Sequence, residues 1–304
     1  MDNRIIGRYT HGAKGPLLIV LSAIHGNEPA GVRALDYLFK MLEVEPITNP
    51  GFQFHGEIIG LIGNLKAFEL KKRFIDFDLN RIWLDEKNSI IAHDVHENLE
   101  KNEIIKTINQ SIADKPERQV VILDLHTTSS EGGIFVIPGP GDVSLEIAKG
   151  LHAPVILNML EDIKGTLMEY YNEDNLGKPI HSLTFESGSH TDPLSTNRAI
   201  AAIINCMRHL NMVNSTDVES IHDDILDQYS KGLPKVTRLL YRHAIDNDDH
   251  FKMNPGFLNF QSVRKDEILA RHNNVPVRSP STGRILMPLY QQQGTDGFYI
   301  VEEV

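Results

Sequence analysis

The chain has 304 residues, of which 41% are hydrophobic and 23% charged, a composition typical of a globular protein with one or two domains. Its formal net charge of −11 disfavours nucleic acid and anionic membranes as partners, because both attract a positive face. No apolar run approaches the roughly 20 residues of a membrane helix, and residues 1–12 show no signal-peptide pattern. A single cysteine, Cys206, excludes an internal disulfide and fits a cytoplasmic location.

The first two thirds of the chain alternate between strand and helix patterns. Residues 17–24 form a short apolar run of the kind found in central parallel strands. Apolar residues from Leu35 to Leu42 repeat at helical spacing and predict a helix over residues 29–43. Further strands are predicted at 57–62, 119–125, 134–137, 155–157 and 183–185, and further helices at 91–113 and 196–210, the last with Ser195 as its N-cap. This alternation predicts an α/β fold with a mixed, mostly parallel sheet flanked by helices.

The pattern changes near residue 212. Residues 213–232 are polar and acidic, so we expect a linker there with at most one short helix. From residue 233, short strand-like runs are separated by Pro and Gly, which predicts a small C-terminal all-β domain. We therefore expect an α/β domain at 1–212, a linker at 213–232 and a β domain at 233–304.

Two polar residues, His25 and Glu28, follow the apolar run at 17–24. The carboxyl ends of parallel strands form the binding edge of an α/β sheet, so both side chains should lie at that edge. Gly26 permits a tight turn and Pro29 suits the first turn of a helix, so His25 and Glu28 can converge on one point. Taken alone, the pair fits a structural role equally well, with His25 at a strand end and Glu28 beside the helix dipole.

His126 follows the clearest strand of the chain, QVVILDL at 119–125. With His25 and Glu28 it completes a set of two histidines and one carboxylate, which is the ligand set of hydrolytic zinc sites that leave one position to water. Nitrogen and oxygen ligands in a tetrahedral site favour zinc over other metals. We therefore predict one zinc ion at these residues, with Asp124 in reach of them.

Glu186 ends the predicted strand at 183–185. A glutamate that is near a metal but does not bind it can take a proton from water and pass it to a leaving nitrogen. We expect this role for Glu186. His190, four residues later, is the one other histidine that we expect near the site.

Arg73, Asn80 and Arg81 lie in the stretch KKRFIDFDLNRIW, which has neither helical nor strand periodicity. Loops of this kind often carry function. Arginine binds carboxylates in a bidentate manner and can stabilise the oxyanion that forms when water attacks a carbonyl. Asp76 and Asp78 could hold these arginines in place.

The four motifs, in this order, resemble the succinylglutamate desuccinylase/aspartoacylase family of zinc carboxypeptidase-like enzymes. The matching strings are HGNE at 25–28, RFIDFDLNR at 73–81, DLH at 124–126 and FESG at 185–188, and the closing segment at 287–301 is also similar. The resemblance implies a zinc carboxypeptidase-like fold. It also implies hydrolysis of an amide that joins an acyl group to an amino acid or amine.

The resemblance further implies a role for each matching residue. These roles are zinc ligand for His25, Glu28 and His126, general base and then acid for Glu186, carbonyl polarisation for Arg73, and binding of a substrate carboxylate for Asn80 and Arg81. The closing segment would contribute Tyr290 or Tyr299. The aspartoacylase subgroup has another arginine some ten residues before the base, and residues 173–183 contain none. The expected partner is a small molecule that bears a carboxylate, and self-association into a homo-oligomer is left open.

Two other functions remain open. A carboxypeptidase that acts on short peptides would use the same metal site, and a binding protein could keep the fold without turnover. A serine or cysteine hydrolase is disfavoured, because the chain has no G-x-S-x-G string. Its one cysteine also lies in an amphipathic helix, where a buried, inert thiol is the usual outcome.

Overall fold

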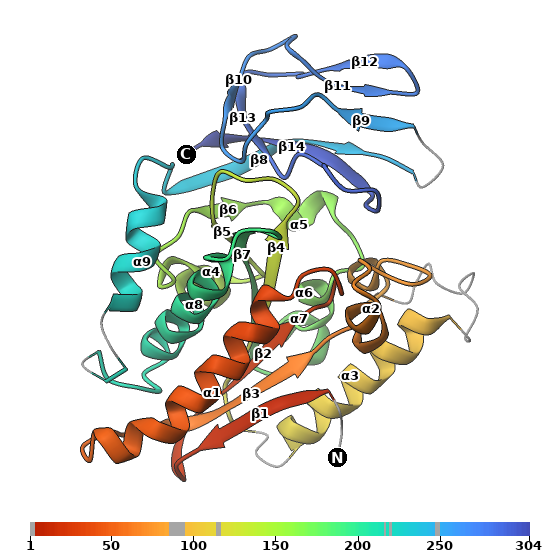
Figure 1. Ribbon diagram of the computed structural model, residues 1–304. Helices are drawn as coiled ribbons and strands as arrows, with labels where there is room; N and C mark the ends of the chain where they lie inside the picture. The colour runs from red at the N-terminus through yellow and green to blue at the C-terminus, as the bar shows by residue number, and fades with distance from the viewer. Residues whose placement is uncertain (1–3, 85–94, 114–116, 216, 219–220, 247–249) are drawn as a thin grey trace.

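The computed structural model describes residues 4–84, 95–113, 117–215, 217–218, 221–246 and 250–304 (Figure 1). The strands are β1 (Ile5–Thr10), β2 (Ala13–Ser22), β3 (His55–Ile62), β4 (Val120–Thr128), β5 (Phe135–Pro138), β6 (Val155–Leu157), β7 (Ile180–Ser189), β8 (Val236–Ala244), β9 (Phe251–Met253), β10 (Ser262–Val263), β11 (Ile268–His272), β12 (Val275–Arg278), β13 (Gly283–Leu286) and β14 (Asp296–Glu303). The helices are α1 (Ala30–Thr48), α2 (Leu65–Leu70), the 3₁₀ turn η1 (Leu79–Arg81), α3 (His96–Ala113), α4 (Asp142–Lys149), α5 (Met159–Asp162), α6 (Leu167–Tyr170), α7 (Glu173–Leu176), α8 (Ser195–His209) and α9 (Ile221–Ser230).

A continuous sheet of eleven strands forms the centre, in the order β1-β3-β2-β4-β7-β5-β6-β8-β14-β13-β10. β2 pairs in parallel with β3 and β4, and β4 pairs in parallel with β7. β5 runs antiparallel to β7, which makes the sheet mixed. β4 and β7 are buried along their whole length, and the apolar start of β4, VVIL, is typical of such a buried strand. The predicted α/β fold with a mixed, mostly parallel sheet is confirmed.

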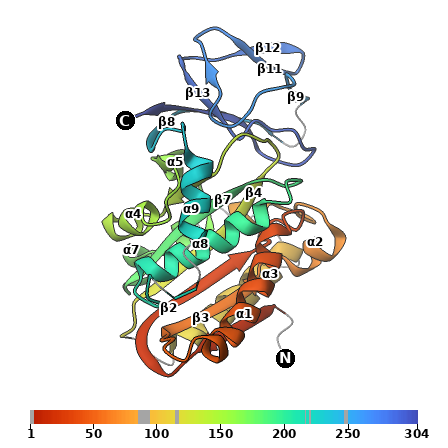
Figure 2. The same cartoon turned by 60° about the vertical axis from the view of Figure 1, so that its left-hand side comes forward.

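Helices cover both faces of this sheet. Successive residues of β2 point to opposite faces, because the side-chain period of a strand is two. Leu18 and Val20 enter one core cluster with residues of α1 and α8, and Leu17 and Ile19 enter another with residues of α3 and Trp83. Figure 2 brings α1 and α8 to the front of the sheet. No helix in the described part of the chain is long and apolar enough to cross a membrane.

The C-terminal residues add strands only, as far as residues 233–246 and 250–304 are described. β8 pairs in parallel with β6, and β14 and β13 follow as antiparallel neighbours. A separate sheet of three strands, β12-β11-β9, packs above them (Figure 1). The all-β character predicted for this part is confirmed.

The large sheet crosses the expected junction between the α/β and β domains, because β6 and β8 are hydrogen-bonded neighbours. The expected linker contains α9, and Leu226 of this helix is buried in the cluster that also holds α8. These contacts do not test the division into domains at 1–212, 213–232 and 233–304, which stays a prediction.

Several element boundaries differ from the predicted ones. α1 continues to Thr48, five residues beyond the predicted end. The apolar repeat does not predict this last turn, because the turn is largely exposed. Ser195 is the first helical residue of α8 rather than its N-cap, and its hydroxyl donates to the carbonyl of Ser189. The predicted helix at 91–113 is present from His96, and residues 91–94 lie outside the described part.

Candidate active site

The parallel strands β2, β4 and β7 bring the candidate residues to one edge of the sheet. His25 and Glu28 lie in the turn between β2 and α1. His126 and Glu186 lie inside β4 and β7, where they are register partners, and not just beyond the strand ends as predicted. Both strands are longer than predicted because their pairing continues to Thr128 and Ser189. All four side chains are buried.

His25, Glu28 and His126 form one compact cluster. The Nδ1 atom of His25 lies 2.9 Å from Glu28 Oε1, and the Nδ1 atom of His126 lies 3.1 Å from Glu28 Oε2. One nitrogen or oxygen atom from each residue lies within 4.8 Å of those from the other two. The cluster therefore offers three ligand atoms that a single metal ion could bind.

Each histidine is also held at its second ring nitrogen by a carboxylate. His25 Nε2 lies 3.0 Å from Asp78 Oδ1, and His126 Nε2 lies 2.8 Å from Asp124 Oδ2. Histidines that bind metals usually donate their other ring N–H to such a group, which sets the ring orientation and raises the basicity of the ligand nitrogen. The arrangement leaves both Nδ1 atoms directed at the shared point beside Glu28.

The electrostatics of the cluster keep Glu28 ionised. Burial raises the pKa of Glu28, but the facing His25 and His126 outweigh burial and hold this pKa well below its usual range. The amide of Thr127 also donates to Glu28 Oε2 over 2.9 Å. Burial lowers the pKa of His126, and the carboxylates of Asp124 and Glu28 overcome this and raise it well above the ordinary value.

Arg73 lies beside the cluster and bridges the carboxylates of Glu28 and Asp78. Its guanidinium lies 3.4 Å from Glu28 Oε1 and 3.1 Å from Asp78 Oδ2. Asp78 therefore holds Arg73, as predicted. Asp76 instead accepts a hydrogen bond from the amide of His96 over 3.0 Å.

Glu186 has one oxygen with no hydrogen-bond partner among the residues that the structure describes. Its side chain is buried, and Oε2 makes no hydrogen bond within the described part of the chain. Burial raises the pKa of Glu186 to about 8, with further upward contributions from Glu28 and Asp124 that His126 and Arg73 partly offset. Glu186 therefore has a free oxygen that can exchange a proton beside the cluster.

Arg81 binds a carboxylate of the chain itself. Its guanidinium lies 2.6 Å from Asp296 Oδ2, while Arg242 Nε lies 2.5 Å from Asp296 Oδ1. Burial lowers the pKa of Arg81, but Asp296 and Asp78 more than compensate and leave it above its ordinary value. The sequence does not point to Asp296 or Arg242, because only the fold brings Asp296 to Arg81 across 215 positions.

Asn80 is directed elsewhere. Its side-chain oxygen accepts a hydrogen bond from the amide of Leu167 over 2.9 Å, at the start of α6. This contact ties η1 to the start of α6. The predicted role of Asn80 in binding a carboxylate stays a prediction.

A small cavity of about 50 Å³ lies beside these residues. Its walls come from both halves of the chain: Arg73, Arg81, Thr127, Thr128, Ser129, Met287, Leu289, Gln291, Gly294, Thr295, Asp296 and Tyr299. Tyr299 is the tyrosine at this cavity. Tyr290 is 40% exposed, and its hydroxyl donates to the carbonyl of Asn254 and accepts from the amide of Phe257.

The segment between β13 and β14 is fastened over the edge of the site. Gln291 Oε1 accepts from Asn27 Nδ2 over 2.9 Å and lies 3.2 Å from His190 Nε2. The other nitrogen of His190 lies 2.6 Å from the hydroxyl of Thr127. Burial lowers the pKa of His190. His190 is thus near the site, as expected, and joins its rim to the C-terminal part.

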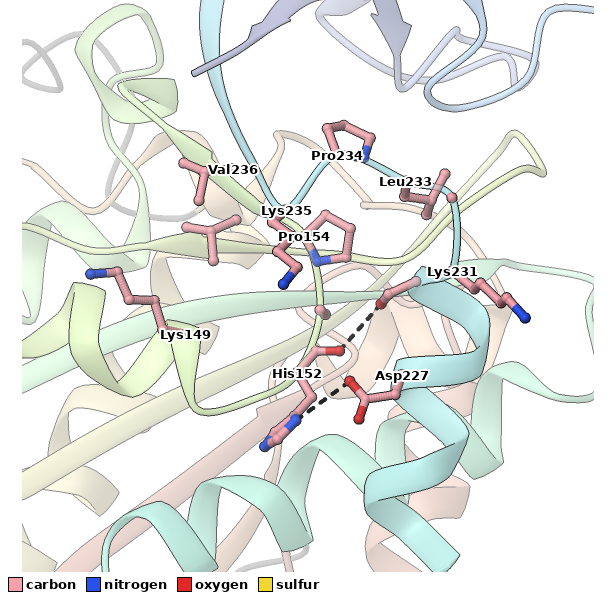
Figure 3. Close-up of a pocket in the computed structure, with 13 residues that line it drawn as sticks. Lys149, His152, Pro154, Asp227, Lys231, Leu233, Pro234, Lys235 and Val236 are labelled. Atoms are coloured by element: carbon pink, nitrogen blue, oxygen red, sulfur yellow. Dashed lines mark hydrogen bonds and ion pairs between the residues drawn. The ribbon is translucent and has the colours of Figure 1, made fainter.

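A larger cavity of about 500 Å³ lies elsewhere, between the end of α9 and the start of β8 (Figure 3). None of the candidate residues lines it. Lys149 at its rim already pairs with Glu146, and the amino groups of Lys149 and Lys231 point away from each other. These groups form no common anion site, so we place the candidate active site at the histidine cluster despite the smaller cavity there.

The fold and the site define an α/β protein with a buried cluster of two histidines and one carboxylate at the carboxyl edge of its sheet. Residues 14–210 match the model of the succinylglutamate desuccinylase/aspartoacylase catalytic domain. This match spans more than half of the chain, and the chain belongs to that family of deacylases.

Three relatives illustrate the similarity. A probable aspartoacylase from Nostoc sp. is 28% identical over 229 residues, which cover 73% of this chain and 68% of that protein. A succinylglutamate desuccinylase from Pseudomonas fluorescens is 25% identical over 248 residues, which cover 78% and 67%. The crystal structure of succinylglutamate desuccinylase from Vibrio cholerae superposes with a TM-score of 0.65 at 18% identity, over 96% of this chain and 82% of that chain. The similarity to this crystal structure shows that the two proteins share a fold.

Proposed function

We propose that this protein is a zinc-dependent hydrolase that cleaves the amide bond of a small N-acyl amino acid or amine bearing a carboxylate. One observation carries the proposal: two buried histidines direct Nδ1 at one glutamate while a carboxylate holds each Nε2. Membership of a deacylase family supports the same reaction class.

The donor set fits zinc. Two imidazole nitrogens and one carboxylate are the protein ligands of several catalytic zinc sites, and His25, Glu28 and His126 would supply them here. When bound, zinc supplies a Lewis acid that polarises a carbonyl and lowers the pKa of a water molecule.

Glu186 would move the proton. Its free Oε2 can accept a proton from the attacking water and then deliver it to the nitrogen of the leaving amine. The buried site keeps bulk water from competing for that proton. This assignment makes Glu186 the general base and then the general acid.

Two arginines would recognise the substrate. The Nε atoms of Arg73 and Arg81 are buried and have no hydrogen-bond partner within the described residues, although both side chains line the small cavity. Arg73, next to the cluster, would stabilise the oxyanion that forms on the attacked carbonyl. Arg81, further along the wall, would bind a substrate carboxylate through its Nε, which Asp296 does not occupy. Asn80 would act with it through its side-chain nitrogen, since its oxygen already accepts from Leu167.

Membership of a family of deacylases favours a small N-acyl amino acid over a peptide as the substrate. A carboxypeptidase remains the second candidate, because it would use the same cluster and arginines.

A panel of substrates separates these functions. We expect the zinc-loaded protein to hydrolyse at least one N-acetyl, N-succinyl or related N-acyl amino acid faster than any dipeptide. Faster cleavage of dipeptides would establish the carboxypeptidase. Tight binding of an N-acyl amino acid without turnover by the zinc-loaded protein would instead show a binding protein.

A further inference from the structure

Glu97 is a buried carboxylate outside the cavity and the histidine cluster. It lies in the first turn of α3, and its exposed fraction is 0%. Burying a carboxylate is costly unless hydrogen bonds replace the lost water. Within the described residues Glu97 forms no ion pair, so hydrogen bonds must compensate its charge.

Four N–H groups surround this carboxylate. Oε1 accepts from the amide of Ile75 over 2.7 Å and from Asn64 Nδ2 over 3.0 Å. Oε2 accepts from the amides of Asp76 and Phe77 over 3.0 and 3.1 Å. A carboxylate has about four acceptor positions, so Glu97 is saturated and needs no external ligand.

The three backbone amides are consecutive and lie between two residues of the candidate active site. Arg73 precedes Ile75 by two positions, and Asp78 directly follows Phe77. The stretch between α2 and η1 has no regular secondary structure, so no helix or strand ladder holds these amides. The hydrogen bonds to Glu97 hold these amides instead.

A second contact joins α3 to the loop from Arg73 to Asp78. The carboxylate of Asp76 accepts from the amide of His96 at the start of α3. The helix thus binds the loop through Glu97, and the loop caps the helix through Asp76. Two reciprocal contacts restrict sliding of the loop along the helix.

We propose that Glu97 is a positioning residue that fixes the loop from Arg73 to Asp78 and, through Asp78, the ring of His25. Asp78 bonds His25 Nε2 and Arg73 at the same time, so a shift of this loop moves a candidate metal ligand and the candidate oxyanion group together. The catalytic consequence of this inference rests on the proposed function, whereas the ordering of the loop does not.

Glu97→Gln is the direct test. The variant keeps the size of the side chain but replaces one acceptor oxygen with an NH₂ group that faces backbone N–H donors. We expect hydrogen exchange of the amides at 75–77 to rise about tenfold or more. On a substrate hydrolysed by the wild type, we expect kcat per bound zinc to fall roughly 10–100-fold.

Glu100→Gln is the matched control. Glu100 lies one turn further along α3 and is also buried. It bonds Arg4, the ring of His96 and the amide of Lys66, and none of these belongs to the loop from Arg73 to Asp78. We expect it to lower stability without raising exchange at 75–77 or changing kcat per bound zinc. Glu97→Asp, which keeps the charge but is one methylene shorter, should lie between wild type and Glu97→Gln and serves if the latter does not fold.

Hydrogen exchange tests whether Glu97 orders the loop, and kcat per bound zinc tests the catalytic consequence. Wild-type exchange at 75–77 in the Glu97 variants would overturn the inference, as would equal effects of the Glu97 and Glu100 variants on exchange. If the wild type hydrolyses no acylated amino acid, the proposed function fails, and the exchange measurement still decides the role of Glu97.

Discussion

His25 and His126 each lie between two carboxylates. The hydrogen bonds distinguish the four acidic residues of the site. Glu28 faces both Nδ1 atoms, while Asp78 and Asp124 bind the Nε2 atoms. Glu186 touches neither histidine nitrogen by hydrogen bond within the described residues and keeps an unpaired oxygen. We therefore assign metal binding to Glu28 and proton transfer to Glu186.

Two single substitutions test this difference. Glu28→Ala removes a ligand, so zinc affinity should fall by more than the roughly 10–100-fold that follows loss of an outer hydrogen-bond partner. Glu186→Ala should retain zinc but lose about 10²–10⁴ in kcat. Zinc titration and initial rates measure both. Full activity of Glu186→Ala, or loss of zinc from it, would exclude the assignment.

The reactivity of Cys206 tests whether the inner face of α8 is buried, and it does not test the candidate site. It is fully buried, and burial raises the pKa of its thiol to about 12. Because the thiolate is the reactive form, the native protein at pH 8 should resist a thiol reagent, whereas the urea-unfolded chain should react with one equivalent. Rapid modification of the folded protein would contradict this burial.

At the scale of elements, the turn between β2 and α1 depends on close approach to α2. A Cβ added at Gly26 would lie 2.1 Å from the carbonyl carbon of Ala67, a backbone atom that cannot move aside. Gly26 also donates from its amide to the carbonyl of Arg73 over 3.1 Å, so the turn contacts the arginine loop as well.

Gly26→Ala should therefore be destabilising and should impair zinc binding. Overpacking costs about 1–3 kcal/mol or more of unfolding free energy, measurable by urea denaturation. Gly51→Ala is the control, because the nearest atom to its added Cβ is Asn49 Oδ1 at 3.5 Å. Equal stability of the two variants would show that the turn does not need this close contact.

The elements that carry the site were predictable to different degrees. The apolar runs of β2 and β4 locate two strand ends, and parallel pairing then brings His25 and His126 together. Glu97 could not be found in this way, because three of its four partners are backbone amides of an irregular loop, and such contacts leave no residue pattern. No apolar repeat predicts the last turn of α1, because this turn is largely exposed.

At the scale of the whole molecule, the C-terminal strands complete the site of the N-terminal part. Asp296, at the start of β14, bonds Arg81 of η1 and Arg242 of β8. These pairings depend on how the strands are arranged, which the linear sequence does not encode locally. Self-association and a cytoplasmic location stay predictions.

Asp296→Asn should lower stability at neutral pH by about 3–5 kcal/mol, because two partly buried arginines lose their carboxylate. Burial raises the pKa of Asp296, but Arg81 and Arg242 outweigh it and lower this pKa. The stability difference from wild type should be full above pH 5 and shrink as the pH falls toward the lowered pKa. Urea unfolding at several pH values measures it.

The exposed pair of Asp36 and Lys40 is the control for that prediction. Asp36→Asn should change the unfolding free energy by less than about 1 kcal/mol, since the side chains of both residues are more than half exposed. A loss for Asp296→Asn no larger than this, or one that grows on acidification, would show that Asp296 does not join the two parts.

The dependence of hydrolysis on zinc tests the central claim most directly. Zinc is removed with a chelator and returned in measured amounts, while hydrolysis of the best N-acyl amino acid is followed. The proposed function predicts an inactive metal-free protein and a rate that rises linearly until one zinc ion is bound per chain. Undiminished hydrolysis by the metal-free protein, or no rise in rate as zinc is returned, would contradict it.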